Sequence, residues 1–311
     1  MSKISVLMSA YNAQEYIEET IKSILNQTFS DFEFIIIDDG SIDNTKMIID
    51  KFNDCRINYY YFENSGLSKS LNRGLKISTG KYIARIDADD ICYPTRLEKQ
   101  YNFMEENPSY VLCGSYTDVI DENGHYIYTF RDIPTSNDCI QKEMEKRNCI
   151  VHSSSFYIRQ IALSIGGYYE PIKQYFEDYM FFYQFLKQGK AYNFSEPLIK
   201  YRLSPGSIST RNKNPKYEKL VQNVIHRGYI NDDEKKFLFD HKKNKAKKHI
   251  QLSNHFLSLS RLVFIHQANF HKSLYYLTKA IKANPFNLNI FVSFLYMIFV
   301  SLLKKSYAKS N

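Results

Sequence analysis

Three carboxylates stand within four residues at the end of an apolar stretch, in the segment KYIARIDADD from Lys81 to Asp90. The like charges of Asp87, Asp89 and Asp90 are close enough to repel one another, so the cluster needs a cation or good solvation. Carboxylate oxygens suit Mg²⁺ and Mn²⁺, and Mg²⁺ commonly combines one or two protein carboxylates with phosphate oxygens. Asp is also common in solvated turns and at helix N-caps. The position of this cluster after an apolar strand favours a divalent metal ion whose coordination shell is completed by a diphosphate.

A second acidic pair, Glu177 and Asp178, opens a predicted amphipathic helix in the segment YFEDYMFFYQFLKQG. Acidic side chains are ordinary in the first turn of a helix, where the helix dipole stabilises the anion. A single positioned carboxylate can also act as a general base toward a hydroxyl group. The local sequence leaves both interpretations open for this pair. Arg85, which lies in the strand before Asp87, is interpreted as a structural cation that balances carboxylates.

The segments around these carboxylates alternate between strands and helices. Four apolar stretches are predicted to be buried strands, namely ISVLMSAYN, FEFIIIDDGS, RINYYYFE and KYIARI. Helices are predicted between them, the first capped by Asn12 with Glu15 three residues later and the second from Asn44 to Phe52. The third helix is predicted in GLSKSLNRGLKIS. Continuous apolar strands that alternate with helices indicate an α/β fold with a parallel sheet covered on both faces.

Polar residues follow the ends of three of these strands. The three groups are Ser9-Ala10-Tyr11-Asn12, Asp38-Asp39-Gly40-Ser41 and Asp87-Ala88-Asp89-Asp90. In sheets of this kind, ligands bind beyond the carboxyl ends of the strands. Because all three groups should lie at one edge of the sheet, the sequence predicts a ligand site there. The pattern is more mixed between residues 110 and 202, where YVLCGSY, GHYIYTF, HSSSFYIR and EPLIKYRL are predicted to be further strands.

The chain divides by composition into two parts. Residues 1–210 carry 22 Lys and Arg against 28 Asp and Glu, whereas residues 211–311 carry 19 against 5. A stretch rich in Pro, Gly, Ser and Asn lies between them and is typical of a boundary. We therefore expect an α/β domain over residues 1–210 and a basic α-helical region over residues 211–311. The Lys-rich run of the second part has no interleaved aromatic residues, which argues against nucleic-acid binding.

The basic part contains an apolar run, Ile290–Leu303, of 14 residues without a charge. It is shorter than the roughly 20 residues that a membrane-spanning helix needs. The preceding segment, Gln267–Pro285, resembles one half of a tetratricopeptide-type hairpin. Two interpretations stay open. The run is either buried against that hairpin or docked on an anionic membrane surface. In the second case, the side chains entering the headgroup boundary are Phe291, Phe294, Leu295, Ile298, Phe299 and Leu302.

The cysteines and the N-terminal segment bear on the compartment. Five cysteines are scattered without a C-x-x-C pair. This is typical of reduced thiols in a cytosolic protein and not of a disulfide framework or a zinc site. The segment MSKISVLMSAYN lacks the longer apolar run and the cleavage site of a signal peptide. We therefore expect a cytoplasmic protein.

Several separate blocks of the sequence occur in an order that resembles the family 2 glycosyltransferases of the GT-A fold. The blocks are SVLMSAYNAQEYIEETIKSILNQTFSDFEFIIIDDGSIDNT, GLSKSLNRGLKISTGKYIARIDADDICYPTRLEKQ, HSSSFYIR, FEDYMFF and YRLSPGSIS. The resemblance covers residues 3–210 and extends to bacterial members that build lipopolysaccharide, capsule and exopolysaccharide. It implies a Rossmann-like, mostly parallel sheet flanked by helices, to which residues 211–311 add a C-terminal α-helical extension.

The resemblance also implies a nucleotide-sugar pocket at the predicted edge of the sheet. Its residues would be Ala10, Tyr11, Asn12, Asp39, Lys69, Asn72, Asp87, Ala88 and Asp89. Within this set, Asp39 would hold the uracil. Asp87 and Asp89 would form the D-x-D motif, with Asp87 toward the ribose and the metal and Asp89 on the metal, which would be Mn²⁺ or Mg²⁺.

The same resemblance assigns the catalytic base and suggests acceptor contacts. Asp178 would be the base, and Glu177 is the next candidate. His152 and Tyr175 are candidates for the acceptor cleft. Arg202 could reach the diphosphate, because Arg binds phosphate in a bidentate manner, but an ordinary ion pair is equally consistent with its position.

The implied reaction is inverting, metal-dependent transfer of one hexose or N-acetylhexosamine from a UDP-sugar. The acceptor would be an oligosaccharide, carried on a polyprenyl diphosphate at the inner face of the cytoplasmic membrane. The family's Q-x-x-R-W motif is absent, because the chain has no Trp, and this favours single-sugar transfer. A sugar nucleotidyltransferase and an inactive nucleotide-sugar-binding module remain as alternatives. The first usually opens with a Gly-rich, cationic loop, where this chain has SAYNAQ. The oligomeric state stays open.

Overall fold

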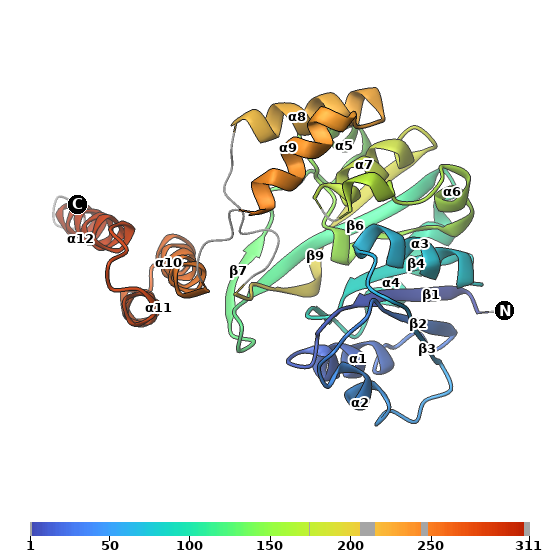
Figure 1. Cartoon of the computed structure of the whole chain (residues 1–311), viewed down its shortest axis with the longest axis horizontal. Helices are drawn as coiled ribbons and strands as arrows, with labels where there is room; N and C mark the ends of the chain where they lie inside the picture. Colours follow the sequence, from blue (N-terminus) through green and yellow to red (C-terminus); the bar gives the residue numbers. More distant parts are fainter. Residues whose placement is uncertain (1, 174, 206–214, 244–247, 308–311) are drawn as a thin grey trace. The chain divides into compact units, whose positions relative to one another are not determined.

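The computed structural model describes residues 2–173, 175–205, 215–243 and 248–307 (Figure 1). Its contacts divide the chain into two compact units. The first unit contains the chain up to Asp118, the stretch Thr129–Tyr201 and the helical segment that ends at Leu238. The second contains the hairpin tip Val119–Tyr128 and the C-terminal helices. Each unit has its own core and is described separately below.

Helices α8 (Pro215–Arg227) and α9 (Asp232–Lys243) belong mainly to the first unit, although the sequence suggested a separate part from residue 211 onward. Their apolar side chains lie in the core of the first unit, and they include Leu220, Val221, Val224, Ile225 and Leu238. The expected boundary at residues 210 and 211 lies outside the described residues. The basic charge counted over residues 211–311 includes these two helices, whose apolar side chains pack in the core of the first unit.

The strands of the described chain form one sheet in the order β3-β2-β1-β4-β8-β6-β9-β5, with β7 beside β6. Their bounds are β1 (Ile4–Ala10), β2 (Phe32–Asp38), β3 (Ile57–Tyr61), β4 (Tyr82–Asp87), β5 (Ile91–Cys92), β6 (Tyr110–Ile120), β7 (Tyr126–Phe130), β8 (Phe156–Ile158) and β9 (Lys190–Arg202). Strands β1 to β4 are parallel, as expected. Strand β8 runs antiparallel to both β4 and β6, and β5 runs antiparallel to β9. The α/β fold is thus confirmed, with a sheet that is mixed beyond β4 and parallel only before it.

Helices cover both faces of the parallel strands, and Figure 1 shows α1 and α2 on one side with α3 on the other. The helices of the first unit before α8 are α1 (Ile17–Leu25), α2 (Thr45–Ile49), α3 (Leu67–Ile77), α4 (Arg96–Glu106), α5 (Asn137–Met144), α6 (Arg159–Ser164) and α7 (Glu177–Phe185). Successive side chains of a strand point to opposite faces. In β1, Leu7 accordingly lies in the core under α3, while Val6 and Met8 lie in the core under α1. Because both faces of these strands are buried, their sequences are continuous apolar runs.

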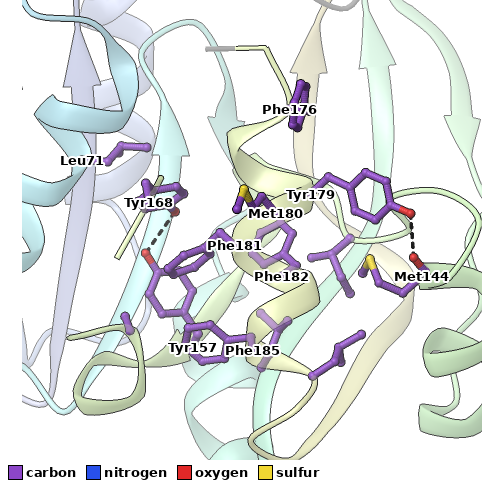
Figure 2. Close-up of a cluster of buried hydrophobic side chains, with 14 of the residues drawn as sticks. Leu71, Met144, Tyr157, Tyr168, Phe176, Tyr179, Met180, Phe181, Phe182 and Phe185 are labelled. Atoms are coloured by element: carbon purple, nitrogen blue, oxygen red, sulfur yellow. Dashed lines mark hydrogen bonds between the residues drawn. The ribbon is translucent and has the colours of Figure 1, made fainter. Parts of the chain in front are cut away.

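An aromatic cluster fixes the position of α7 on the sheet (Figure 2). Phe181 stacks on Tyr168 with ring centroids 4.1 Å apart and meets Tyr157 edge-on at 5.2 Å. The hydroxyl groups of Tyr157 and Tyr168 lie 3.3 Å apart. On the other side of the helix, the hydroxyl of Tyr179 donates to the main-chain carbonyl of Met144 at 2.7 Å. Large buried rings in one packed arrangement hold the start of α7 in a defined place.

The second unit is built on α10 (Lys248–Gln267), α11 (Phe270–Ala283) and α12 (Asn289–Tyr307). Helices α10 and α11 pair as the hairpin pattern predicted, and the Ser273 hydroxyl donates to the Ser260 carbonyl at 2.7 Å. Helix α12 packs against both, and it buries Ile290 and Met297. The interpretation of this run as a packed helix is therefore correct for one face of α12.

Polar contacts join the β6–β7 turn to the helices within this second unit. The hydroxyl of Tyr276 donates to the carboxylate of Asp121. The carboxylate of Glu122 lies 3.4 Å from His255 Nε2 and 3.1 Å from Lys279 Nζ. Burial alone would raise the pKa of Glu122, but hydrogen bonds, led by that from His255, hold this pKa at about 2. A buried carboxylate with two basic partners is a stabilising contact only while it is ionised.

We therefore expect Glu122→Gln to reduce stability in a pH-dependent way. The pKa of Glu122 is lower in the folded chain than the ordinary 4.5. The stabilisation is then complete above about pH 4.5 and is lost as the pH falls toward about 2. The free energy of unfolding should drop by about 2 kcal/mol at pH 7, and the difference from wild type should shrink on acidification. Urea unfolding between pH 7 and pH 2.5 measures this, with Glu218→Gln on the surface of α8 as control. A difference that stays constant with pH would contradict the assignment.

Two further sequence expectations can be compared with the described residues. Within the described part of the chain, no helix combines the length and the hydropathy needed to cross a bilayer. All five cysteines are free thiols, with Cys92, Cys113 and Cys149 buried and Cys55 and Cys139 exposed.

Candidate active site

The carboxyl ends of the parallel strands meet at one edge of the sheet, as the sequence predicted. The register pairs Ala10 of β1 with Asp38 of β2, and Ser9 of β1 with Asp87 of β4. The pairing continues outward from Asp38 to Tyr61 of β3. Residues separated by dozens of positions in the chain are thus neighbours at this edge. The edge is the place where a ligand of such a sheet binds.

The loop after β1 is bonded to the loop after β2. The amide N–H of Asn12 donates to Ser41 Oγ at 2.9 Å, and the N–H of Ile42 donates to Asn12 Oδ1 at 2.9 Å. Asn12 has a φ of 50° and does not cap α1, which starts at Ile17, so the predicted N-cap is wrong. Its carboxamide instead joins the two loops. Tyr11, beside it, remains 53% exposed and can contact a ligand at this edge.

Asp39, expected at the nucleobase, is buried and bonded to the turn before α3. Its carboxylate accepts hydrogen bonds from the N–H groups of Ser65 at 3.0 Å and Gly66 at 2.8 Å. The guanidinium of Arg73 lies 3.8 Å away. Gly66 has a φ of 93°, which favours glycine at this position. Asp39 therefore shapes the wall of the site, and a contact with a nucleobase would come in addition to these bonds.

Asn72 has partners other than those the sequence suggested. Its Nδ2 donates to the Tyr168 carbonyl at 2.8 Å, and its Oδ1 accepts from the Tyr168 N–H at 2.8 Å. These paired bonds tie α3 to the segment before α7. A cavity of about 370 Å³ lies beside both residues and is also lined by Glu170 and Gln184. The carboxylates at the strand ends do not line this cavity. Lys69, on the same helix, is exposed.

Arg85 is the nearest described cation to the D-x-D segment. Its side chain is 1% exposed, and both of its terminal nitrogens donate to the carboxylate of Asp87. Burial opposes the charged form, but the charge of Asp87 raises the pKa of Arg85. The sequence interpretation of Arg85 as a structural cation that balances carboxylates is confirmed. The side chain of Asp87 remains one-third exposed, so its outer edge is accessible.

Hydrogen bonds with α1 and with the segment before β8 hold the turn after β4, in which Asp89 is partly exposed. Ala88 is buried, and its carbonyl accepts from Thr20 Oγ1 at 3.0 Å. The N–H of Asp87 donates to Ser153 Oγ at 2.9 Å. Among the described residues, no three His, Cys, Asp or Glu side chains are grouped to hold a metal. Two partly exposed carboxylates, Asp87 and Asp89, fit a cation that takes most of its ligands from phosphate and water.

Sequence reasoning missed Arg96 and Gln100 as residues that fix this turn. Arg96 is fully buried, and its Nη2 donates to the carbonyls of Arg85 at 2.7 Å and Ser155 at 3.2 Å. Gln100 Nε2 donates to the Ser154 carbonyl at 2.8 Å. The two side chains stand four residues apart on α4 and clamp β4 to the segment before β8. An Arg and a Gln at helical spacing on the apolar face of a helix were the available signal.

The acidic pair at the start of α7 lies within electrostatic reach of the β4 end. Burial, with the charge of Asp178, raises the pKa of Glu177, and burial also raises the pKa of Asp178. In both cases the charge of Arg85 lowers the pKa and the charge of Asp87 raises it. Asp178 Oδ2 accepts from Asn148 Nδ2 at 2.7 Å, and Oδ1 accepts from the Tyr179 N–H at 2.8 Å. Hydrogen bonds to both oxygens therefore orient the Asp178 carboxylate.

His152 contacts the acidic pair through Glu177. Its Nδ1 lies 3.9 Å from Glu177 Oε1, and its Nε2 lies 2.9 Å from the Tyr168 hydroxyl. Burial, together with the charge of Arg85, lowers the pKa of His152 well below its ordinary value, so the ring is neutral. The side chain is only 10% exposed. The sequence suggested that His152 lines the acceptor cleft, and in the structure its largely buried ring lies beside Glu177 and Tyr168.

The two other acceptor candidates, Tyr175 and Arg202, make contacts within the protein that support the fold. Tyr175 is partly buried against the core, and its carbonyl accepts from the Tyr217 hydroxyl at 3.1 Å. Arg202 belongs to the second unit, is 2% exposed, and directs Nη1 at the carbonyls of Asp121 and Glu122, both at 3.4 Å.

Comparison with known sequences gives a consistent result. A sequence model described as glycosyl transferase family 2 matches residues 5–166. An uncharacterized glycosyltransferase of Haemophilus influenzae is 36% identical over 220 residues, which cover 67% of each chain. The O-antigen biosynthesis glycosyltransferase WbnJ of Escherichia coli is 34% identical over 65% of this chain and 80% of its own length. The amylovoran biosynthesis glycosyltransferase AmsE of Erwinia amylovora is 30% identical over 67% of this chain and 79% of its own.

Comparison with solved structures supports the fold. The crystal structure of S. aureus TarS 1-349 in complex with UDP-GlcNAc superposes with a TM-score of 0.60 at 18% sequence identity. The match covers 90% of this chain and 89% of that one. At this identity the likeness concerns the fold.

Proposed function

This chain belongs to glycosyl transferase family 2 and is a glycosyltransferase, and from this premise we propose that it moves a single hexose or N-acetylhexosamine from a UDP-sugar to a saccharide. Relatives named for O-antigen and amylovoran biosynthesis support a role in polysaccharide biosynthesis. The acceptor would be an oligosaccharide carried on a polyprenyl diphosphate at the inner face of the cytoplasmic membrane. A fold neighbour crystallised with UDP-GlcNAc makes UDP-sugars the first donors to test.

One observation carries this proposal. The end of β4, with Asp87, and the start of α7, with Glu177 and Asp178, lie around the buried Arg85 and act on one another electrostatically. Glycosyl transfer needs stabilisation of a leaving diphosphate on one side of the sugar and a proton acceptor on the other. Carboxylates from two distant segments that converge on one site can supply both.

Asp178 is the better base of the acidic pair. It is partly exposed, whereas Glu177 is buried behind it against His152. Asn148 and the Tyr179 N–H orient the Asp178 carboxylate. In the proposed step, Asp178 takes the proton of the acceptor hydroxyl while the hydroxyl oxygen attacks the anomeric carbon. The bond from that carbon to the diphosphate breaks, and UDP leaves with the electron pair. A single displacement of this kind inverts the anomeric configuration.

Asp89 and Asp87 are proposed to face the diphosphate and the ribose. Asp89 would hold Mn²⁺ or Mg²⁺, and Asp87, fixed by Arg85, would support it and face the ribose. When bound, the cation stabilises the charge that develops on the leaving diphosphate. Ala10, Tyr11, Asn12 and Asp39 would line the nucleoside end of the pocket, because the β1 and β2 loops meet there.

The test is donor turnover by the purified chain. UDP release from UDP-glucose, UDP-galactose, UDP-GlcNAc and UDP-GalNAc would be measured with Mn²⁺, with Mg²⁺ and with EDTA. We expect slow, metal-dependent release from one of these donors without acceptor. Calorimetric binding of a UDP-sugar without any release would instead indicate an inactive binding module. Release of pyrophosphate from a nucleoside triphosphate and a sugar phosphate would indicate a nucleotidyltransferase. The absence of both binding and release would contradict the donor class.

A further inference from the structure

Helix α12 has two apolar faces, and only one of them is used in the core of the second unit. Ile290 and Met297 are buried, whereas Phe291, Leu295 and Phe299 are 63%, 65% and 61% exposed. Residues four apart lie on one side of a helix, so the exposed three form a continuous stripe. Val292, at 61% exposure, widens it. We call Phe291, Val292, Leu295 and Phe299 the apolar stripe.

The segments next to the apolar stripe also carry exposed apolar and aromatic side chains. In the loop before α12, Phe286 and Leu288 are 88% and 78% exposed. Tyr275 of α11 and Tyr296 of α12 are half exposed. Tyrosine combines an apolar ring with a polar tip and is enriched where an apolar phase meets water. Exposed apolar groups gathered in this way mark an interaction site more often than isolated ones do.

The charge of the C-terminal segment that carries α12 indicates the kind of partner. From residue 241 to the end, the chain has 12 Lys and Arg and no Asp or Glu. The carboxylates that the hairpin tip adds to this unit, Asp121 and Glu122, are turned inward onto Tyr276, His255 and Lys279, so the positive charge of the C-terminal segment attracts anionic surfaces with little local repulsion. Nucleic acid is also anionic, but its interfaces are polar and hydrogen-bonded, and a stripe of Phe, Val and Leu offers no such contacts. Anionic lipid headgroups above hydrocarbon match both the charge and the apolar stripe.

We propose that the apolar stripe is a docking surface for an anionic lipid bilayer, with α12 lying in the plane of the headgroups. The buried face of α12 stays on α10 and α11, so docking requires no unfolding of the second unit. The inference rests on the proposed function in one respect, because a polyprenyl-linked acceptor would lie in such a membrane. It deepens that function by naming the surface that brings the enzyme to its acceptor.

The experiment uses the full chain and vesicles of phosphatidylcholine with or without phosphatidylglycerol. We expect co-sedimentation with the anionic vesicles at low salt, weaker binding at high salt, and little binding to the neutral vesicles. The double variant Phe291→Ser/Leu295→Ser should bind at least about tenfold more weakly, because two large side chains no longer enter the lipid. The matched control Met47→Ser/Tyr229→Ser removes two exposed apolar groups outside α10–α12 and should bind like wild type.

A second measurement reports insertion without removing the apolar stripe. The chain contains no Trp, so Leu295→Trp introduces a single fluorophore. Its emission should shift to the blue with anionic vesicles and be quenched by brominated lipid, whereas that of Tyr229→Trp should not change. Equal binding of the double variant and wild type, or an unquenched Leu295→Trp, would overturn the proposal. Binding to an oligonucleotide but not to vesicles would show that the partner is nucleic acid. UDP release without vesicles is measured in parallel, so that a failure of the proposed function is recognised separately.

Discussion

Replacing Asp89 with alanine is expected to reduce metal-dependent UDP-sugar turnover by at least about 10³-fold. Asp89 is the partly exposed carboxylate of the turn after β4, and the proposed cation has few other protein ligands there. Stabilisation of the leaving diphosphate by a metal contributes several kcal/mol, and each 1.4 kcal/mol corresponds to a factor of ten in rate. UDP release at saturating donor, with and without added Mn²⁺, measures the loss.

Two controls separate a metal site from a general effect on folding. Glu63→Ala removes an exposed carboxylate from the loop after β3 and should leave UDP release unchanged. Circular dichroism should show the same fold for Asp89→Ala and wild type, and urea unfolding reports any change in stability separately from the loss of turnover. Removal of the metal by EDTA should reproduce the loss in the wild-type chain. Full turnover in EDTA, or in the Asp89→Ala protein, would remove the metal from the proposal.

Replacing Asp178 with asparagine should lower transfer at least about 10²-fold while donor and metal binding persist. Asparagine keeps the shape of the side chain but cannot take a proton at neutral pH. The bonds from Asn148 and from the Tyr179 N–H should still orient its carbonyl oxygen. Single-turnover transfer to a saccharide acceptor measures the chemical step, and calorimetry with UDP measures binding.

Glu177→Gln is the matched control for that experiment. Burial and the charge of Asp178 raise the pKa of Glu177, so its neutral form is favoured and glutamine imitates it. We expect a much smaller loss than in Asp178→Asn. The reverse order of effects would identify Glu177 as the base. The anomeric configuration of the product, read by NMR, gives an independent result, because retention would contradict a single displacement by an oriented hydroxyl.

The three predicted strand ends illustrate how far the sequence leads. Apolar runs with polar ends fixed β1, β2 and β4, and parallel pairing then required Asn12, Asp39 and Asp87 to share one edge. That step needs only the two-residue period of a strand and the rule that ligands bind beyond the carboxyl ends of parallel strands. Both can be applied to the sequence of each segment by itself. The helix after Asn12 is present as α1, but its predicted N-cap is wrong, because Asn12 accepts a hydrogen bond from Ile42 across thirty positions of sequence. The order of motifs also led from the sequence to the family.

The tertiary structure alone decided which charges face one another. Arg85 and Asp87 share a face of β4 by the period of the strand, but the effect of the Arg85 charge on Glu177 and Asp178 depends on how α7 packs over the sheet. The neighbours of His152, Tyr168 and Glu177, are likewise set by the packing of distant segments.

Helix α12 shows the same limit at the other end of the chain. Its apolar run predicted a helix that buries side chains, but which residues are buried depends on α10 and α11. Packing against α10 and α11 buries Ile290 and Met297 and leaves Phe291, Leu295 and Phe299 exposed to solvent. Periodicity is a property of one segment and can be read from the sequence. Burial and charge pairing are properties of two segments that meet, and only the folded chain determines which segments those are.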